Sequence, residues 1–167
     1  MCSGPLGLSM AGLEILKNRA RFSASHERFL VHKHLYPVPR LKEAAVLGNV
    51  DNISTSMLDT SDDLASSMGI LARQSRVGFE CDLSSAVIHS ALRRFCLDRK
   101  ASPLSCILYG GEDYELLFTV SPGNVKKVLA KIPSSHILGR VLPSSQGIRI
   151  TSGGRRLSLK DARFRHF

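Results

Sequence analysis

Residues 110–118 read GGEDYELLF, so that two glycines and two adjacent acids run directly into an apolar segment. Paired glycines permit a backbone with positive φ, or the close approach of a ligand to the main chain. The residues from Leu116 to Val120 then have the composition of a core strand. The strand is explained by packing, but the acids before it fit either a tight solvated turn or a ligand contact.

A second acidic cluster, DTSDD at residues 59–63, lies upstream of this stretch. It follows a short strand candidate at 56–59 and opens a helical pattern that runs from 61 to about 75. A turn from strand to helix presents free backbone N–H groups and the positive end of the helix dipole to a phosphate. Neighbouring carboxylates can hold the counter-cation, so the cluster predicts either magnesium-phosphate binding or a capped helix start.

The remaining periodicity predicts intermixed helices and strands. Leu13, Leu16 and Ala20 are expected to form the buried face of the first helix. We expect further strands over residues 77–83, 136–141, 147–151 and 156–159, a hairpin turn at Gly153-Gly154, and helices over 9–20, 25–35, 39–47, 85–97 and 121–132. Because helices and strands do not alternate strictly, the pattern predicts an α/β fold of the α+β type, with a mixed β-sheet covered by helices.

Length and composition describe an ordinary globular domain. The chain has 167 residues, of which 43% are hydrophobic and 22% charged. No apolar run approaches the roughly 20 residues that cross a bilayer, and the first residues lack the features of a signal peptide, so a cytoplasmic protein without membrane contact is expected. The four cysteines lack metal-site spacing. No catalytic residue is assigned, because no nucleophile–base order and no Walker-type loop stands out.

The net charge of +9 raises the alternative of a nucleic-acid-binding domain. The basic residues are spread along the chain, however, without the interleaved aromatic residues on which bases stack. We therefore interpret most of them as solvated faces, with some contribution to attracting a small phosphate-bearing substrate.

Five segments taken in order resemble thiamine-monophosphate kinase. They are residues 3–13 (SGPLGLSMAGL), 34–40 (HLYPVPR), 58–62 (LDTSD), 109–118 (YGGEDYELLF) and the closing His166-Phe167. The likeness covers essentially the whole chain, but only the C-terminal domain of that family. The family shares a two-domain plan with aminoimidazole ribonucleotide synthetase, selenophosphate synthetase and a hydrogenase-maturation protein. The resemblance therefore implies a PurM-like C-terminal domain over residues 1–167, with the N-terminal ATP-binding domain absent.

The resemblance implies a direct in-line transfer of phosphate from ATP to thiamine monophosphate, which gives thiamine diphosphate with the help of Mg²⁺ and without a phosphoenzyme. By position, Asp59 and Asp62 match family magnesium ligands, and Ser61 matches a residue that contacts ATP. Glu112 matches a substrate contact. Phe164 stands where the family has an aromatic residue that packs on the flat, cationic substrate, an arrangement that suits an aromatic face.

Three residues depart from the family pattern. Asp63 stands where glycine is usual, Ser67 replaces an acid, and Arg165 replaces an aspartate. Because the other half of the family's metal and nucleotide shell is missing, we expect negligible kinase activity from the chain alone, with a separate N-terminal-domain partner or a homodimer as the alternatives for completing it. A non-catalytic relic or interaction module of the same fold remains the second interpretation.

Overall fold

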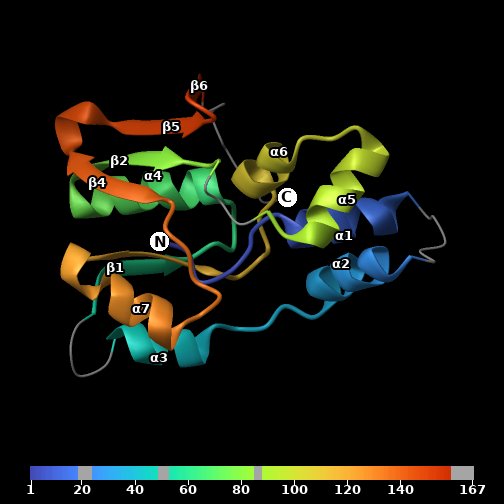
Figure 1. Ribbon diagram of the computed structural model, residues 1–167, viewed down its shortest axis with the longest axis horizontal. Coiled ribbons are helices and arrows are strands. Elements are labelled where there is room, and N and C mark those ends of the chain that lie inside the picture. The colour runs from blue at the N-terminus through green and yellow to red at the C-terminus, as the bar shows by residue number, and fades with distance from the viewer. Residues whose placement is uncertain (19–23, 49–52, 85–87, 159–167) are drawn as a thin grey trace.

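The computed structural model describes residues 1–18, 24–48, 53–84 and 88–158. Its strands form two β-sheets (Figure 1). The first sheet is the antiparallel pair β1 (Ser54–Asp59) and β3 (Leu116–Val120). The second has the order β4-β2-β5-β6, from β2 (Val77–Asp82), β4 (Gly139–Pro143), β5 (Ile148–Ser152) and β6 (Arg155–Leu157). Strand β2 runs parallel to β5 and antiparallel to β4, so this sheet is mixed, as the sequence predicted.

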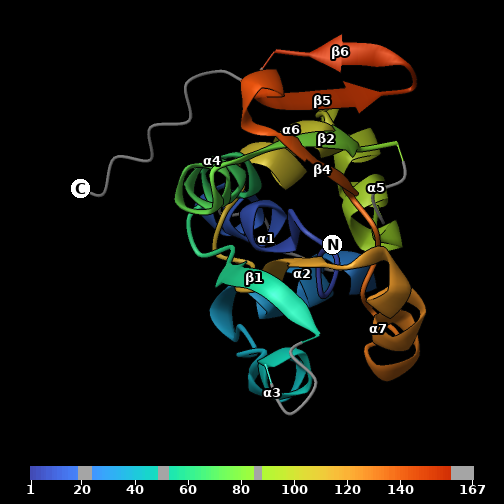
Figure 2. The ribbon, with the colours of Figure 1, turned by 90° about the vertical axis from the view of Figure 1, so that its left-hand side faces the viewer.

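Helices lie on more than one side of the sheets (Figures 1 and 2). Leu117 of β3 belongs to the main core, whereas Leu116 and Phe118 belong to a second, smaller core. The helices are α1 (Leu8–Lys17), α2 (Ser25–Leu35), α3 (Leu41–Gly48), α4 (Leu64–Ser75), α5 (Ser90–Arg99), α6 (Pro103–Tyr109) and α7 (Val125–Lys131). Helices α1, α2, α5 and α6 form a cluster, and α4 contacts strands of both sheets. Within the described ranges, no helix has the length and apolar character needed to cross a membrane.

The first residues of the chain connect the two sheets. Cys2 forms a β-bridge with Leu117 of β3 and another with His136, just before β4. Its backbone N–H donates to the His136 carbonyl at 3.0 Å, and the His136 N–H donates back at 2.9 Å. This double pairing fixes β3, and with it the loop at residues 110–115 that precedes β3.

The buried face of α1 differs from the prediction. The residues that α1 buries are Leu8, Ser9, Ala11, Gly12 and Ile15, whereas the predicted Leu13 and Leu16 are only partly buried and Ala20 lies outside the described residues. The reason is a close helix crossing. A Cβ atom added to Gly12 would lie 2.2 Å from the carbonyl oxygen of Leu30 in α2, so the two backbones touch there.

Candidate functional site

The two acidic segments singled out from the sequence meet at one end of the β1–β3 sheet. The backbone N–H of Glu112 donates to the carbonyl of Ser61 at 2.8 Å. Gly111 has φ of +66°, and a Cβ atom there would lie 1.6 Å from the carbonyl oxygen of Asp62. Glycine is therefore required at position 111 both for its conformation and for the contact. Residues 59–63 and 110–115 form one structural unit, which we call the acidic site.

Pairing between β1 and β3 accounts for this meeting. Asp59, the last residue of β1, lies opposite Leu116, the first residue of β3. Beyond the strands, the N–H of the buried Thr60 donates to the carbonyl of Glu115 at 2.8 Å. Two segments that are far apart in sequence therefore leave the same end of the sheet side by side.

Two carboxylates of the turn at residues 59–63 are open to solvent. Asp59 is exposed and accepts a hydrogen bond from the Ser61 hydroxyl at 3.2 Å, and Asp62 is partly exposed. Hard oxygen ligands of this kind suit Mg²⁺. Among the residues that the structure describes, however, no three His, Cys, Asp or Glu side chains are grouped closely enough to hold a metal ion. Asp59 and Asp62 therefore supply oxygen atoms of the type that Mg²⁺ prefers, without forming such a group among the described residues.

Two of the departures from the family pattern have local roles here. Asp63 is 3% exposed, and its carboxylate accepts the backbone N–H of Ser66 at 2.6 Å, so it caps α4. The hydroxyl of Ser67, which is also buried, donates to the main-chain carbonyl of Asp59 at 3.2 Å. Asp63 thereby occupies one of the N–H groups that a phosphate at this helix start would use.

Asp113 anchors the start of α1. Its carboxylate accepts the backbone N–H of Gly7 at 2.5 Å and that of Ser9 at 2.9 Å. Burial raises the pKa of Asp113 to about 6, and the two N–H donors oppose that rise by favouring the ionised form. These contacts give Asp113 a structural role.

Glu115 is likewise committed to structure. Its carboxylate is buried and accepts hydrogen bonds from Nε of Arg40 at 2.9 Å and from Nη2 of Arg40 at 2.5 Å. The hydroxyl of Ser3 donates to it as well, at 2.5 Å. This bidentate pair explains the arginine of the Pro-x-Pro-Arg run, because it ties the segment before α3 to the start of β3.

Glu112 and Tyr114 are the residues of this loop whose side chains remain accessible. Both have left-handed backbones, with φ of 56° and 52°. Such conformations are costly for residues other than glycine and cluster at ligand-binding sites. The Glu112 side chain is 49% exposed, and its Oε2 lies 3.5 Å from Nδ1 of His34. Tyr114 is 39% exposed.

The sequence-predicted site is therefore brought together in part. Asp59, Ser61, Asp62 and Glu112 share the acidic site. Phe164 and Arg165 lie outside the described residues, so their predicted roles stay predictions. The positive φ of Tyr114 could not be foreseen from its residue type.

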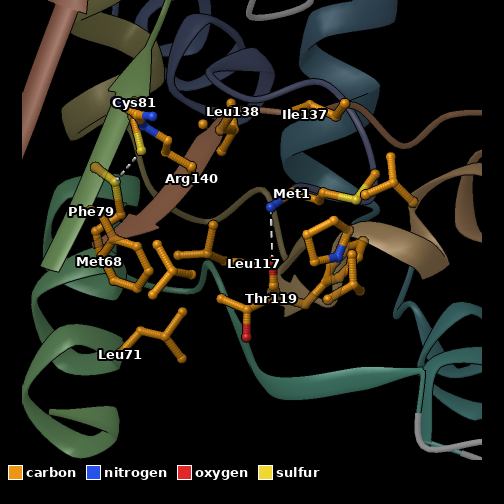
Figure 3. Close-up of a pocket in the computed structure, with 16 residues that line it drawn as sticks. Met1, Met68, Leu71, Phe79, Cys81, Leu117, Thr119, Ile137, Leu138 and Arg140 are labelled. Carbon is orange, nitrogen blue, oxygen red and sulfur yellow. Dashed lines mark hydrogen bonds between the residues drawn. The ribbon is translucent and has the colours of Figure 1, made fainter. Parts of the chain in front are cut away.

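An apolar cavity lies away from the acidic site. It has a volume of about 380 Å³ and opens between the two sheets (Figure 3). Its walls are mostly apolar and include Met68, Phe79, Leu117 and Ile137. None of the sequence-predicted site residues lines it, and no sequence signal indicated it. We therefore place the candidate chemistry at the acidic site, where the polar groups converge.

The fold places this chain in a class of α/β domains with solved representatives. It matches the crystal structure of thiamine monophosphate kinase from Aquifex aeolicus with a TM-score of 0.75 and 27% identity, over 93% of this chain and 50% of that one. A structure of AaThiL complexed with AMPPCP and TMP matches with a TM-score of 0.80 and 27% identity, over 93% and 48%. Escherichia coli HypE shares the fold, with a TM-score of 0.73 and 19% identity over 97% and 49%. The class is the PurM-like fold, as predicted.

Sequence comparison identifies the relatives within that class. The chain is 32% identical to thiamine-monophosphate kinase of Buchnera aphidicola subsp. Schizaphis graminum over 171 residues, which cover 99% of this chain and 51% of the relative. It is 39% identical to that of Escherichia coli K12 over 119 residues, covering 71% and 35%. No family model matches. The chain is a relative of the thiamine-monophosphate kinases, as its motifs predicted, and spans about half the length of the first of these enzymes.

Proposed function

We propose that residues 1–167 are the substrate-side, C-terminal-type domain of a thiamine-monophosphate kinase, and that another domain or chain contributes the ATP-binding half. The observation that carries this proposal is the hydrogen bond of 2.8 Å from the Glu112 N–H to the Ser61 carbonyl. It holds the candidate substrate residue beside the candidate metal and ATP residues, as a transfer between two phosphate-bearing molecules requires.

Glu112 is proposed to bind the organic part of thiamine monophosphate. The substrate carries a cationic thiazolium ring and an aminopyrimidine, and a half-exposed carboxylate suits both a cation and an N–H donor. The exposed ring of Tyr114 adds an aromatic face in the same loop. Phe164 is proposed to pack on the substrate rings from the end of the chain.

Asp59 and Asp62 are proposed to hold Mg²⁺, and Ser61 to contact ATP. The ion would neutralise charge on the phosphates during transfer. An octahedral magnesium shell has about six positions, so two carboxylates leave most of it to water, phosphate oxygens and the other half of the enzyme. The chain alone therefore lacks much of what phosphoryl transfer needs.

The capping role of Asp63 favours a second candidate, a non-catalytic relic of the same fold. Its carboxylate accepts the Ser66 N–H at 2.6 Å and places negative charge where α4 would otherwise receive a phosphate. A relic would retain the fold and the hydrogen bond between Glu112 and Ser61, but would support no phosphoryl transfer in any mixture.

Reconstitution separates the two candidates. The purified chain is mixed with the complementary half of a thiamine-monophosphate kinase, ATP, Mg²⁺ and thiamine monophosphate, and formation of thiamine diphosphate is followed. We expect turnover only in the mixture, and a loss of about 100-fold or more in the Asp59→Asn/Asp62→Asn variant, because charge neutralisation dominates this chemistry.

The matched control for reconstitution is Asp98→Asn, which removes an exposed carboxylate on α5 outside the acidic site. It should leave turnover within about twofold, as expected for a surface change. Turnover by the chain alone would contradict the proposal, and a mixture that stays inactive would favour the relic.

A further inference from the structure

His34, near the end of α2, stands between two groups of different elements. Its Nδ1 lies 2.9 Å from the hydroxyl oxygen of Ser9 in α1 and 3.5 Å from Oε2 of Glu112. The imidazole is largely buried, with 16% of the side chain exposed, whereas the Glu112 side chain is 49% exposed. One ring nitrogen thus faces both a buried hydroxyl and the candidate substrate carboxylate.

The position of His34 is set by backbone packing. A Cβ atom on Gly12 would lie 2.2 Å from the Leu30 carbonyl oxygen and 2.9 Å from the His34 Cβ, so α1 and α2 touch beside this histidine. Ser9 is itself fixed, because it is buried and its N–H donates to Asp113 at 2.9 Å. His34 and Ser9 therefore form a fixed pair against which the half-exposed Glu112 side chain can pack.

Glu112 has need of such a partner. Its main chain is held by the hydrogen bond to Ser61, but this bond does not select a rotamer for a half-exposed carboxylate. A carboxylate that samples several rotamers must be immobilised when a ligand binds, and that cost lowers affinity. Nδ1 of His34 lies 3.5 Å from one oxygen, and by donating to it this nitrogen would remove part of the cost and leave the other oxygen for the ligand.

We propose that His34 is a positioning residue for Glu112, supported by Ser9, and that it orients the Glu112 carboxylate toward the cationic, amine-bearing part of the substrate. This inference rests on the proposed function for the identity of the ligand. The contact between His34 and Glu112 stands apart from that function and is testable without any ligand.

The binding experiment compares isosteres of the imidazole. Thiamine monophosphate is titrated calorimetrically into the wild-type chain and into His34→Ala, His34→Asn and His34→Gln. Asparagine places its amide nitrogen near the position of Nδ1, and glutamine near that of Nε2. We expect alanine and glutamine to weaken binding about 3- to 10-fold, in the range of a single hydrogen bond, and asparagine, which keeps an N–H donor near Nδ1, to stay within about twofold.

Two further variants separate positioning from packing. His32→Ala removes an exposed histidine from the same helix and should leave affinity unchanged. In a Glu112→Gln background, His34→Ala should add no loss, because the two residues act as a unit. The proposal is overturned if His34→Asn binds thiamine monophosphate as weakly as His34→Ala does. It is also overturned if His34→Ala lowers the affinity equally in the wild-type and Glu112→Gln backgrounds.

A ligand-free measurement keeps the inference distinct from the proposed function. The ring nitrogen signals of the histidines are recorded by NMR in the wild type, Glu112→Gln and Asp98→Asn. Glu112→Gln should shift the Nδ1 signal of His34, whereas Asp98→Asn should shift His26, whose Nε2 lies 3.7 Å from Asp98, and leave His34 in place. A His34 signal that ignores Glu112→Gln would refute the contact. Failure of the wild type to bind thiamine monophosphate would instead count against the proposed function.

Discussion

Replacing Glu115 by alanine will lower the free energy of unfolding by about 3 kcal/mol, the cost of breaking a buried ion pair and leaving its partner uncompensated. The carboxylate of Glu115 is 4% exposed, and its partner Arg40 is 19% exposed. The substitution also removes the acceptor of the buried Ser3 hydroxyl. Urea denaturation followed by circular dichroism measures the change.

The same arginine provides the control for Glu115→Ala. Glu43 lies 3.5 Å from Nη1 of Arg40 and is more exposed, at 23%. Glu43→Gln should cost about 1 kcal/mol or less, as peripheral ion pairs do. If Glu115→Ala destabilises the chain no more than Glu43→Gln, the buried pair does not anchor the start of β3 as we infer.

Gly111→Ala will separate the loop at residues 110–115 from the turn at residues 59–63. At φ of +66°, an alanine Cβ would lie 1.6 Å from the Asp62 carbonyl oxygen, which no side-chain rotation can relieve. We expect a loss of about 3 kcal/mol of stability, or a local opening that sacrifices the hydrogen bond from Glu112 to Ser61. Amide hydrogen exchange distinguishes these outcomes, because the exchange rate of the Glu112 N–H reports whether its hydrogen bond to Ser61 is present.

Gly123→Ala is the matched control for Gly111→Ala. Nothing lies within 4 Å of a Cβ atom at Gly123, so its effect should be within about 0.5 kcal/mol. Unchanged exchange at Glu112 in Gly111→Ala, with stability equal to that of Gly123→Ala, would show that the two acidic segments are not held together at this glycine.

Much of the fold was predictable because its signals are local. The helix at 25–35 has the predicted bounds, and Gly153 and Gly154 both have positive φ as a turn requires. Helix α6 was missed, because Pro103–Tyr109 is only seven residues long and too short to show a helical repeat. The prediction of the buried face of α1 was wrong because it counted only apolar side chains, whereas Gly12 makes a close backbone contact with α2.

The candidate site was predictable in position but not in function residue by residue. The sequence shows five carboxylates, at residues 62, 63, 112, 113 and 115, without showing their partners. Arg40 is 75 positions from Glu115, and Gly7 is 106 positions from Asp113. Only the tertiary structure assigns those two acids to stability and leaves Glu112 available. Asp63 and Ser67, noted as departures, proved to have local roles that residue type alone does not specify.

Calorimetric titration of thiamine monophosphate into the isolated chain in the presence of Mg²⁺ measures whether the acidic site binds the substrate. We predict saturable binding by the wild type, a loss of at least about tenfold in Glu112→Ala, since removal of a charge-assisted contact is worth about 1.4 kcal/mol or more, and unchanged affinity in Glu14→Ala, which removes an exposed glutamate of α1. Equal affinities in all three chains, or no binding by the wild type, would contradict the assignment of the acidic site to the substrate.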